Sequence, residues 1–172
     1  INPEHAHVLR GRKTDVKDAE WLADLLRHGL LQASFIPPLE IRELRELTRY
    51  RDSVVREQSR VANRIQKVIE SGNVKLGQVA SDALGASGRA MLWALARGET
   101  DAAKLAALAK KQLKEKVPEL QRALQGRLTI NQRFVLKELL QRWEELEQAD
   151  KRVTQEIAQY VQERPKLARA RE

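Results

Sequence analysis

The chain has 172 residues, of which 42% are hydrophobic, 33% are charged and only 4% are aromatic, and its formal net charge is +8. It contains no cysteine, which excludes disulfides and thiolate metal sites, and no stretch approaches the roughly 18 apolar residues that a membrane span needs. The first residues lack the apolar run of a signal peptide, so we expect a cytoplasmic protein with no membrane partner. The positive charge makes nucleic acid the first partner to consider.

The first predicted element is an amphipathic helix over residues 14–31. Thr14 is a suitable N-cap, and Asp15 and Asp18 follow in the first turn, where carboxylates complement the helix dipole. Apolar residues recur at spacings of three and four through this stretch, and Gly29 near its end is a stop signal.

Residues 34–38 (SFIPP) must interrupt the helical pattern, because a proline pair cannot continue a helix. Two long helices are then predicted, at about 39–71 and 129–163, each about 50 Å long. Their apolar residues follow the a and d positions of heptads, a pattern typical of coiled coils. These residues are Leu44, Leu47, Val54, Val61, Ile65 and Val68 in the first helix and Leu136, Leu139, Trp143, Leu146, Val153, Ile157 and Tyr160 in the second.

The matched lengths favour an antiparallel hairpin, or pairing with copies from another subunit. Polar residues at a positions would fix the register, and an antiparallel arrangement places Arg51 of the first helix near Asp150 of the second. Two helices bury each apolar stripe on one side only, and Phe134 and Leu140 widen the second stripe. The chain is therefore expected to be at least a dimer.

Six glycines punctuate residues 72–128, which we expect to form a small helical tip on the hairpin. Thr100 is the predicted cap of its third helix, and Pro118 is predicted in the first turn of its last. The four short helices are predicted at roughly 76–83, 87–97, 101–113 and 118–125. Without any alternating strand pattern, the predicted fold class is all-α.

Asp15 and Asp18 are the sharpest chemical candidates. Residues three apart on a helix share a face, so their carboxylates can approach a common ion, as two-metal phosphoryl chemistry requires. Dipole capping alone would also produce this pair.

The run GRKTDVKDAEWLADLLRHGLL (residues 11–31), followed by SFIPP, RELRELTRYR and SDALGASGRAML, resembles the DEDD-type insertion-sequence transposases. These recombinases are related to the Piv DNA invertases and are guided by a structured bridge RNA. The resemblance implies an N-terminal RuvC-like domain with four acidic Mg²⁺ ligands, of which Asp15 and Asp18 match the third and fourth. It also implies an inserted coiled coil and a C-terminal domain with a serine nucleophile, whose surroundings none of the six serines matches.

The chain is accordingly expected to be an interior fragment of a DNA transposase. Residues 1–36 would end the RuvC-like catalytic domain, and residues 37–172 would form the coiled-coil domain. The expected cofactor of the full enzyme is Mg²⁺, and the expected partners are DNA, a structured guide RNA and a second copy of the chain. With only two of four ligands, the fragment alone is expected to be inactive.

Basic residues suggest two contacts with nucleic acid. Arg10, Arg12, Lys13 and Lys17 crowd the two aspartates and could attract a phosphate backbone, or could form a solvated loop. Lys110, Lys111 and Lys114, with Lys104 and Lys116, form a basic block in the tip. Arginines along the first long helix are mixed with acidic residues, which favours a solvated flank of the coiled coil over a dedicated nucleic-acid groove (Arg49, Arg51, Arg56, Arg60 and Arg64).

Two alternatives from other functional classes stay open. One is a structural dimerisation module in which Asp15 and Asp18 only cap a helix. The other is a helical nucleic-acid-binding adaptor without a catalytic role. An upstream Asp-bearing strand and a downstream serine domain in the full gene would distinguish the enzyme from both.

Overall fold

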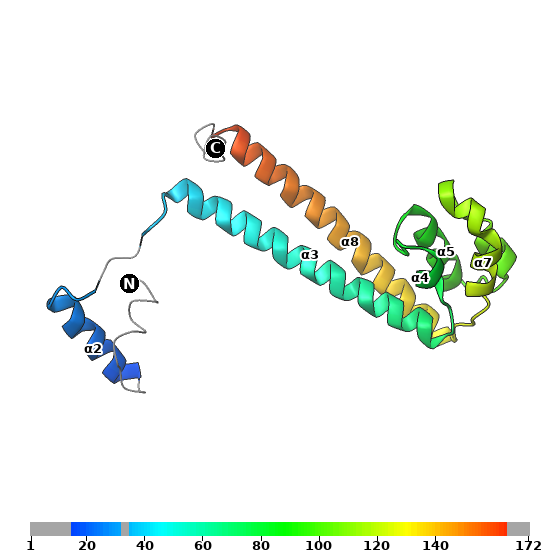
Figure 1. Ribbon diagram of the computed structural model, residues 1–172, viewed down its shortest axis with the longest axis horizontal. Coiled ribbons are helices and arrows are strands. Elements are labelled where there is room, and N and C mark those ends of the chain that lie inside the picture. The colour runs from blue at the N-terminus through cyan, green and yellow to red at the C-terminus, as the bar shows by residue number, and fades with distance from the viewer. Residues whose placement is uncertain (1–14, 32–34, 165–172) are drawn as a thin grey trace. The chain divides into compact units, whose positions relative to one another are not determined.

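The computed structural model describes residues 15–31 and 35–164, and within these ranges every regular element is a helix (Figure 1). The predicted all-α class is therefore confirmed. The chain divides into two compact units, residues 1–43 and 44–172, which are described separately. The elements are α2 (Asp15–Arg27), α3 (Leu39–Ser71), α4 (Leu76–Val79), α5 (Ala86–Ala96), α6 (Ala102–Ala106), the 3₁₀ helix η1 (Lys111–Lys116), α7 (Val117–Ala123) and α8 (Ile130–Gln162).

The helix predicted over residues 14–31 is shorter in the structure, where α2 ends at Arg27, and the expected stop at Gly29 and the proline break follow it. Gly29 has a φ of +67°, and the Leu30 amide donates to the Leu25 carbonyl at 3.0 Å, the hydrogen-bond pattern of a glycine-terminated helix. The proposed cap Thr14 lies outside the described residues. After the proline pair, α3 begins at Leu39, and the Pro38 carbonyl accepts the first amide hydrogen bonds of the new helix.

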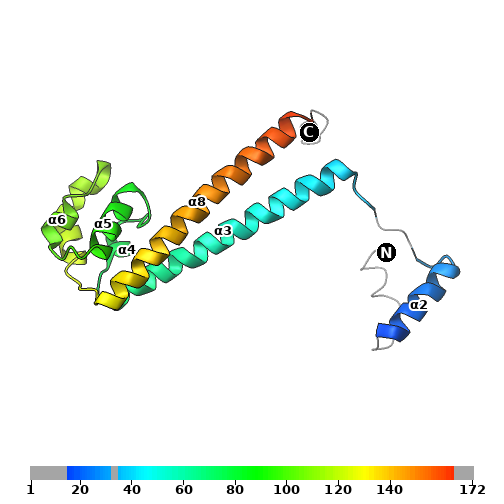
Figure 2. The ribbon, with the colours of Figure 1, turned by 180° about the vertical axis from the view of Figure 1, so that it is seen from behind.

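The two long helices α3 and α8 form the predicted antiparallel hairpin (Figures 1 and 2). Thr129 caps α8 in a capping box: its hydroxyl accepts from the Gln132 amide at 3.2 Å, and the Gln132 side chain accepts from the Thr129 amide at 2.8 Å. The same Gln132 side chain donates to the Ser71 hydroxyl at 2.9 Å. This bond joins the start of α8 to the end of α3.

Cross-helix ion pairs confirm the predicted register. Arg51 Nε lies 3.0 Å from Asp150 Oδ1, as expected for an antiparallel pair, and it donates a hydrogen bond to the Thr154 hydroxyl at 2.9 Å. About two turns nearer the tip, Arg142 pairs with Glu57 at 2.7 Å. Hydrogen bonds from the Arg142 guanidinium to Glu57 and Glu145 raise the pKa of Arg142. Both pairs hold the helices at one relative position along their length.

The chain enters and leaves the tip, residues 72–128, where two backbone segments lie in close contact. The Arg127 amide donates to the Gly72 carbonyl at 2.9 Å, and the Lys75 amide donates to the Ala123 carbonyl at 2.8 Å. A Cβ atom at Gly126 would collide with the backbone of Gly72 and Asn73. Glycine is therefore required where the two segments meet.

Inside the tip, the predicted helix over 101–113 is wrong, because it breaks into α6 and η1. The Lys110 amide donates to the Ser87 hydroxyl at 2.9 Å instead of continuing the helical ladder, and Lys111 has a φ of +53°. The predicted cap Thr100 is also wrong. Asp101 is the cap, and its carboxylate accepts from the amides of Ala103 and Lys104.

The other short helices are present with shifted bounds. The segment predicted as 76–83 ends as a helix at Val79, whereas α5 and α7 lie within a few residues of their predicted positions. Pro118 lies in the first turn of α7, as predicted. The glycine-rich region is therefore a helical tip whose internal boundaries depend on side-chain hydrogen bonds.

The tip folds back on the first half of α8 through α5. Trp93 Nε1 donates to Glu144 at 2.8 Å, Arg89 pairs with Glu147 at 3.0 Å, and the Arg89 guanidinium lies 5.2 Å from the ring centre of Trp143. The core of the second unit combines residues of the tip with residues of α8. Its fully buried side chains include Leu76, Met91, Leu92, Leu105, Leu120, Leu124, Leu136 and Leu140.

This packing corrects one step of the argument for a dimer. Leu140 was expected to need a second chain, but it is fully buried by its own chain. Phe134, by contrast, is 64% exposed. The added apolar width of α8 therefore serves mainly to bind the tip.

Candidate metal-binding helix and basic surfaces

The candidate metal ligands lie at the start of α2. Asp15 is the first residue of the helix and Asp18 lies one turn later, so the two positions share a helix face. Their side chains lie outside the part of the chain whose side chains the structure describes. By helical periodicity the same face continues through Leu22 and Leu25, which are both half-buried. The two aspartates therefore occupy the N-terminal end of the apolar stripe of α2.

The described part of α2 shows no competing metal site. His28 Nδ1 lies 2.9 Å from the Asp24 carbonyl and 3.6 Å from its carboxylate, so this histidine completes the helix end. Among the residues that the structure describes, no three His, Asp or Glu side chains gather as a metal site would require. A metal bound at Asp15 and Asp18 would need further ligands from elsewhere.

The basic residues predicted around the aspartates are not placed by the structure. Arg10, Arg12 and Lys13 precede the described residues, and Lys17 lies within α2 with its side chain outside them. Their proximity to Asp15 and Asp18 in space stays a prediction from the sequence.

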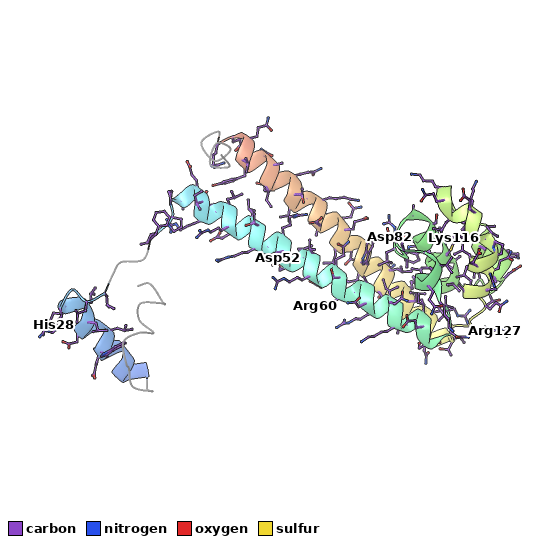
Figure 3. The ribbon with its side chains drawn as sticks, in the orientation of Figure 1. His28, Asp52, Arg60, Asp82, Lys116 and Arg127 are labelled. Atoms are coloured by element: carbon purple, nitrogen blue, oxygen red, sulfur yellow. The ribbon has the colours of Figure 1, made fainter. Side chains whose placement is uncertain are left out.

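The basic block of the tip is exposed as predicted. Lys104, Lys110, Lys111, Lys114 and Lys116 are all exposed side chains on or beside α6 and η1. Lys116 is labelled in Figure 3. No ion pair to any of these five lysines occurs within the described residues. We call these five residues the tip lysines.

Acidic side chains of the tip are largely engaged with the backbone. Asp101 caps α6, Glu99 accepts from the amides of Thr100 and Asp101, and Asp82 accepts from the Leu84 amide at 3.1 Å. Residues 72–128 contain ten Lys or Arg but only five Asp or Glu. The tip therefore presents uncompensated positive charge to solvent.

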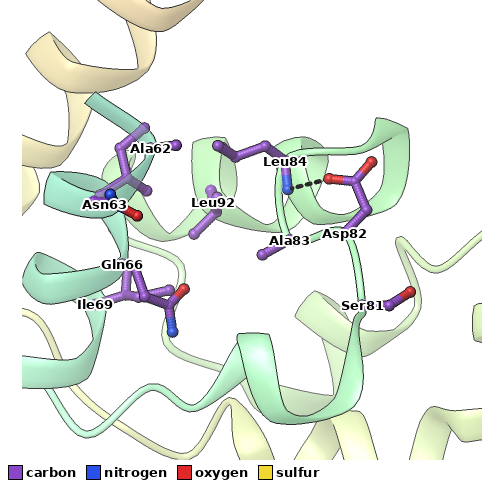
Figure 4. Close-up of a pocket in the computed structure, with 10 residues that line it drawn as sticks. Ala62, Asn63, Gln66, Ile69, Ser81, Asp82, Ala83, Leu84 and Leu92 are labelled. Carbon is purple, nitrogen blue, oxygen red and sulfur yellow. Dashed lines mark hydrogen bonds between the residues drawn. The ribbon is translucent and has the colours of Figure 1, made fainter. Parts of the chain in front are cut away.

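A groove lies between α3 and the loop before α5 (Figure 4). Its floor is apolar, with Ile65, Ile69 and Leu92, and Asn63 and Gln66 lie on its rim. Ser81 and Asp82 lie at the far side, where Asp82 is held by the Leu84 amide. Neither a histidine nor a pair of carboxylates lines this groove, so it lacks the groups of a hydrolytic site.

Charges on α3 are more segregated than expected from the sequence. The mixture of arginines and acids along the chain favoured a solvated flank over a nucleic-acid groove. In the hairpin, the face of α3 turned away from α8 carries exposed basic residues (Arg45, Arg49, Arg56, Arg60 and Lys67). Plotting the helix at 3.6 residues per turn would have revealed this separation.

The first part of the chain is similar to a known protein family. Residues 1–73 match the model of the IS110-type DEDD transposase family, described as a transposase. The first 73 residues of this chain are therefore similar to the DEDD-type insertion-sequence transposases. The matched transposase segment includes the helix that begins with Asp15 and the whole of α3, whereas the tip and α8 follow it.

The same comparison made against curated proteins and solved structures finds no match. None of the helices in the described ranges is long and apolar enough to cross a membrane.

Proposed function

We propose that this transposase segment supplies two metal ligands, Asp15 and Asp18, to a Mg²⁺-dependent site for site-specific insertion and excision of a mobile element. The observation that carries the proposal is the family match, which includes α2 with both aspartates at its start. Their shared position on the apolar stripe directs that end of the helix toward the rest of a domain rather than toward solvent.

Carboxylates are hard oxygen ligands, so the two residues suit Mg²⁺. The bound ion would activate the attacking group and stabilise charge on the phosphate oxygens. Within the chain, Asp15 and Asp18 would hold and orient the ion, and Arg10, Arg12, Lys13 and Lys17 would attract the DNA backbone toward it. Because only two of the four acidic ligands implied by the resemblance are matched in this chain, the chain alone should neither hold the ion firmly nor cut DNA.

The remainder of the chain serves assembly in this proposal. The hairpin of α3 and α8 joins two copies of the protein. Lys110, Lys111 and Lys114 of the tip contact the backbone of structured guide RNA or DNA. Support comes from the unpaired charge of the tip lysines and from the few aromatic side chains available for base stacking.

A direct test replaces Asp15 or Asp18 by Asn in the transposase that contains this chain, with Asp24→Asn as the matched control on the same helix. Asn keeps the size of the side chain but removes the charge that binds Mg²⁺. Excision of the mobile element should fall by at least about 100-fold in the first two variants and remain unchanged in the control.

Circular dichroism of the variants would establish that the helices are intact. Retained excision in both Asp15→Asn and Asp18→Asn would support the non-catalytic alternative, in which these residues only cap α2.

A further inference from the structure

The outward face of α3 is a continuous basic surface. From Arg45 to Lys67, five basic side chains project within about 40° of one line along the helix. These residues, which we call the α3 basic face, are Arg45, Arg49, Arg56, Arg60 and Lys67. Arg64 projects beside them, about 60° from the line.

This face lies opposite the hairpin contact. Val54, Val61 and Ile65, which are at most 5% exposed, pack toward α8 on the other side of α3. All members of the α3 basic face are exposed, as is Arg64, and Arg60 lies on the side of α3 away from α8 (Figure 3). The face is therefore available to a partner in the folded chain.

The charge on this face is of one sign. No Asp or Glu projects within the same sector, and Glu46, Asp52 and Glu70 lie at its edges, about 60° away. Asp52 pairs with Arg56 at 2.8 Å, and Glu70 accepts a hydrogen bond from Gln66 at 2.7 Å. The other members of the face have no ion pair within the described part of the chain.

Helix stability alone does not explain this arrangement. Arg45 with Arg49, Arg56 with Arg60, and Arg60 with Arg64 are like charges four residues apart, and each such pair costs about 0.2–0.5 kcal/mol. A solvated flank of a hairpin would gain the same amount from alternating signs. The repulsion is relieved when a polyanion binds, which is the property expected of a docking surface.

Geometry favours double-stranded DNA as that polyanion. From Arg45 to Lys67 the face extends about 33 Å at 1.5 Å per residue, close to the 34–36 Å of one turn of the duplex. Four of its five members are arginines, whose planar guanidinium groups bind phosphate in a two-pronged manner. The face also lies entirely within the segment that matches the transposase family, whereas the tip does not.

We infer that the α3 basic face docks lengthwise on a DNA duplex and contacts backbone phosphates along about one helical turn of its axis. This surface is separate from the tip lysines and from the metal-binding helix. The inference rests on the proposed function only in taking DNA as the substrate of the protein.

The test measures binding of the chain to a 20-base-pair DNA duplex as salt is varied. Arg49→Gln/Arg60→Gln removes two charges from the face, and Gln has a similar helix propensity. Lys137→Gln/Arg152→Gln, on exposed positions of α8, removes the same charge elsewhere. The slope of log affinity against log salt should fall by about 2 in the first variant, and affinity at about 0.1 M salt should fall roughly 10- to 100-fold. The control should change the slope by less than about 0.5.

Three results would overturn the inference. One is an equal loss in the two double variants, which would indicate only general electrostatic attraction. Another is a loss confined to an RNA duplex of the same length, and the third is unchanged DNA binding in Arg49→Gln/Arg60→Gln. A further variant, Lys110→Gln/Lys111→Gln/Lys114→Gln, separates the two proposals. If it alone loses DNA or RNA binding, the tip contact stands and the α3 basic face is refuted.

Discussion

The half of the α3–α8 hairpin next to the tip and the half farther from it carry the same heptad pattern but are buried to different depths. In the inner half, Val61 and Ile65 of α3 and Leu136 and Leu146 of α8 are at most 4% exposed. In the outer half, the corresponding apolar residues are only half-buried (Leu44, Leu47, Val153, Ile157 and Tyr160).

The difference arises from a third layer. The tip packs through α5 against the inner half of α8, so apolar side chains there contact neighbours on more than one side. In the outer half the tip does not reach α8 within the described residues, and two helices cover only one side of an apolar stripe. A heptad pattern therefore predicts which residues share a face, whereas the depth of their burial depends on what else covers that face.

The boundary between the halves is the Arg51–Asp150 pair. On its inner side, Val54 and Leu146 are 5% and 4% exposed, and on its outer side Leu47 and Val153 are half-buried. Charged side chains tolerate this position because solvent still reaches them: the Arg51 side chain is 44% exposed and that of Asp150 is 26% exposed. The ion pair thus lies where the three-layered core ends.

The largest expected effect is a difference in the free energy of unfolding between substitutions at equivalent positions on the two sides of this boundary. Leu146→Asp places a carboxylate without a partner in the core and should lower the free energy of unfolding by more than about 4 kcal/mol. Val153→Asp, one heptad farther out on α8, should cost less than about 1.5 kcal/mol, because solvent reaches that position. Urea denaturation followed by circular dichroism would measure both. Equal losses would show that the two halves are equally buried in solution.

Dimer formation should depend on the outer half. We expect the chain to be a dimer at about 100 µM by sedimentation equilibrium, with the half-buried stripe of the outer hairpin covered by a second copy. Leu47→Gln/Ile157→Gln should make it monomeric while leaving helical content unchanged, because these side chains contribute little to the fold of one chain.

The control for this experiment is Val135→Gln, which changes an exposed apolar residue in the inner half of α8 and should leave the dimer intact. A wild-type chain that is monomeric and fully helical at the same concentration would refute the dimer and leave the hairpin as a feature of one chain.

Long-range features of the hairpin could be predicted from the sequence because heptads and proline breaks are local signals. The bounds of α3, the termination of α2 just before Gly29 and the pairing of Arg51 with Asp150 follow from local sequence signals. The tip was predicted less well. The break after α6 depends on a hydrogen bond between Lys110 and Ser87, residues 23 positions apart, which no local pattern reveals.

Parts of the candidate sites could also be predicted. The motif around Asp15 and Asp18 identified the family, and the exposure of the tip lysines follows from their charge. The α3 basic face escaped notice because its members are separated in sequence by acids that project to other sides of the helix. The packing of α5 on Leu140 could not be foreseen, since the same apolar width would equally fit a second subunit.

The smallest expected effect lies at the boundary itself. Asp150 Oδ1 is buried and accepts no hydrogen bond, because Arg51 Nε directs its hydrogen to Thr154. The ion pair is also partly exposed, so its contribution should be below about 1 kcal/mol. Asp150→Leu removes the desolvated oxygen and adds apolar contact, while Arg51 keeps its bond to Thr154 and its access to water.

Asp150→Leu should therefore raise the free energy of unfolding by about 1 kcal/mol, and the midpoint of thermal unfolding by about 2–4 °C for a chain of this size. Asp52→Ala, which breaks the exposed Asp52–Arg56 pair on the same hairpin, should change stability by less than about 0.5 kcal/mol.

The stabilised Asp150→Leu variant should also lose selectivity for one register, because an uninterrupted apolar stripe can slide against its partner. Disulfide trapping between cysteines introduced at Leu47 and Val153 would report this as a lower yield of the native pairing. A loss of stability in Asp150→Leu would show that the ion pair is a net stabiliser, and unchanged trapping would show that it does not select the register.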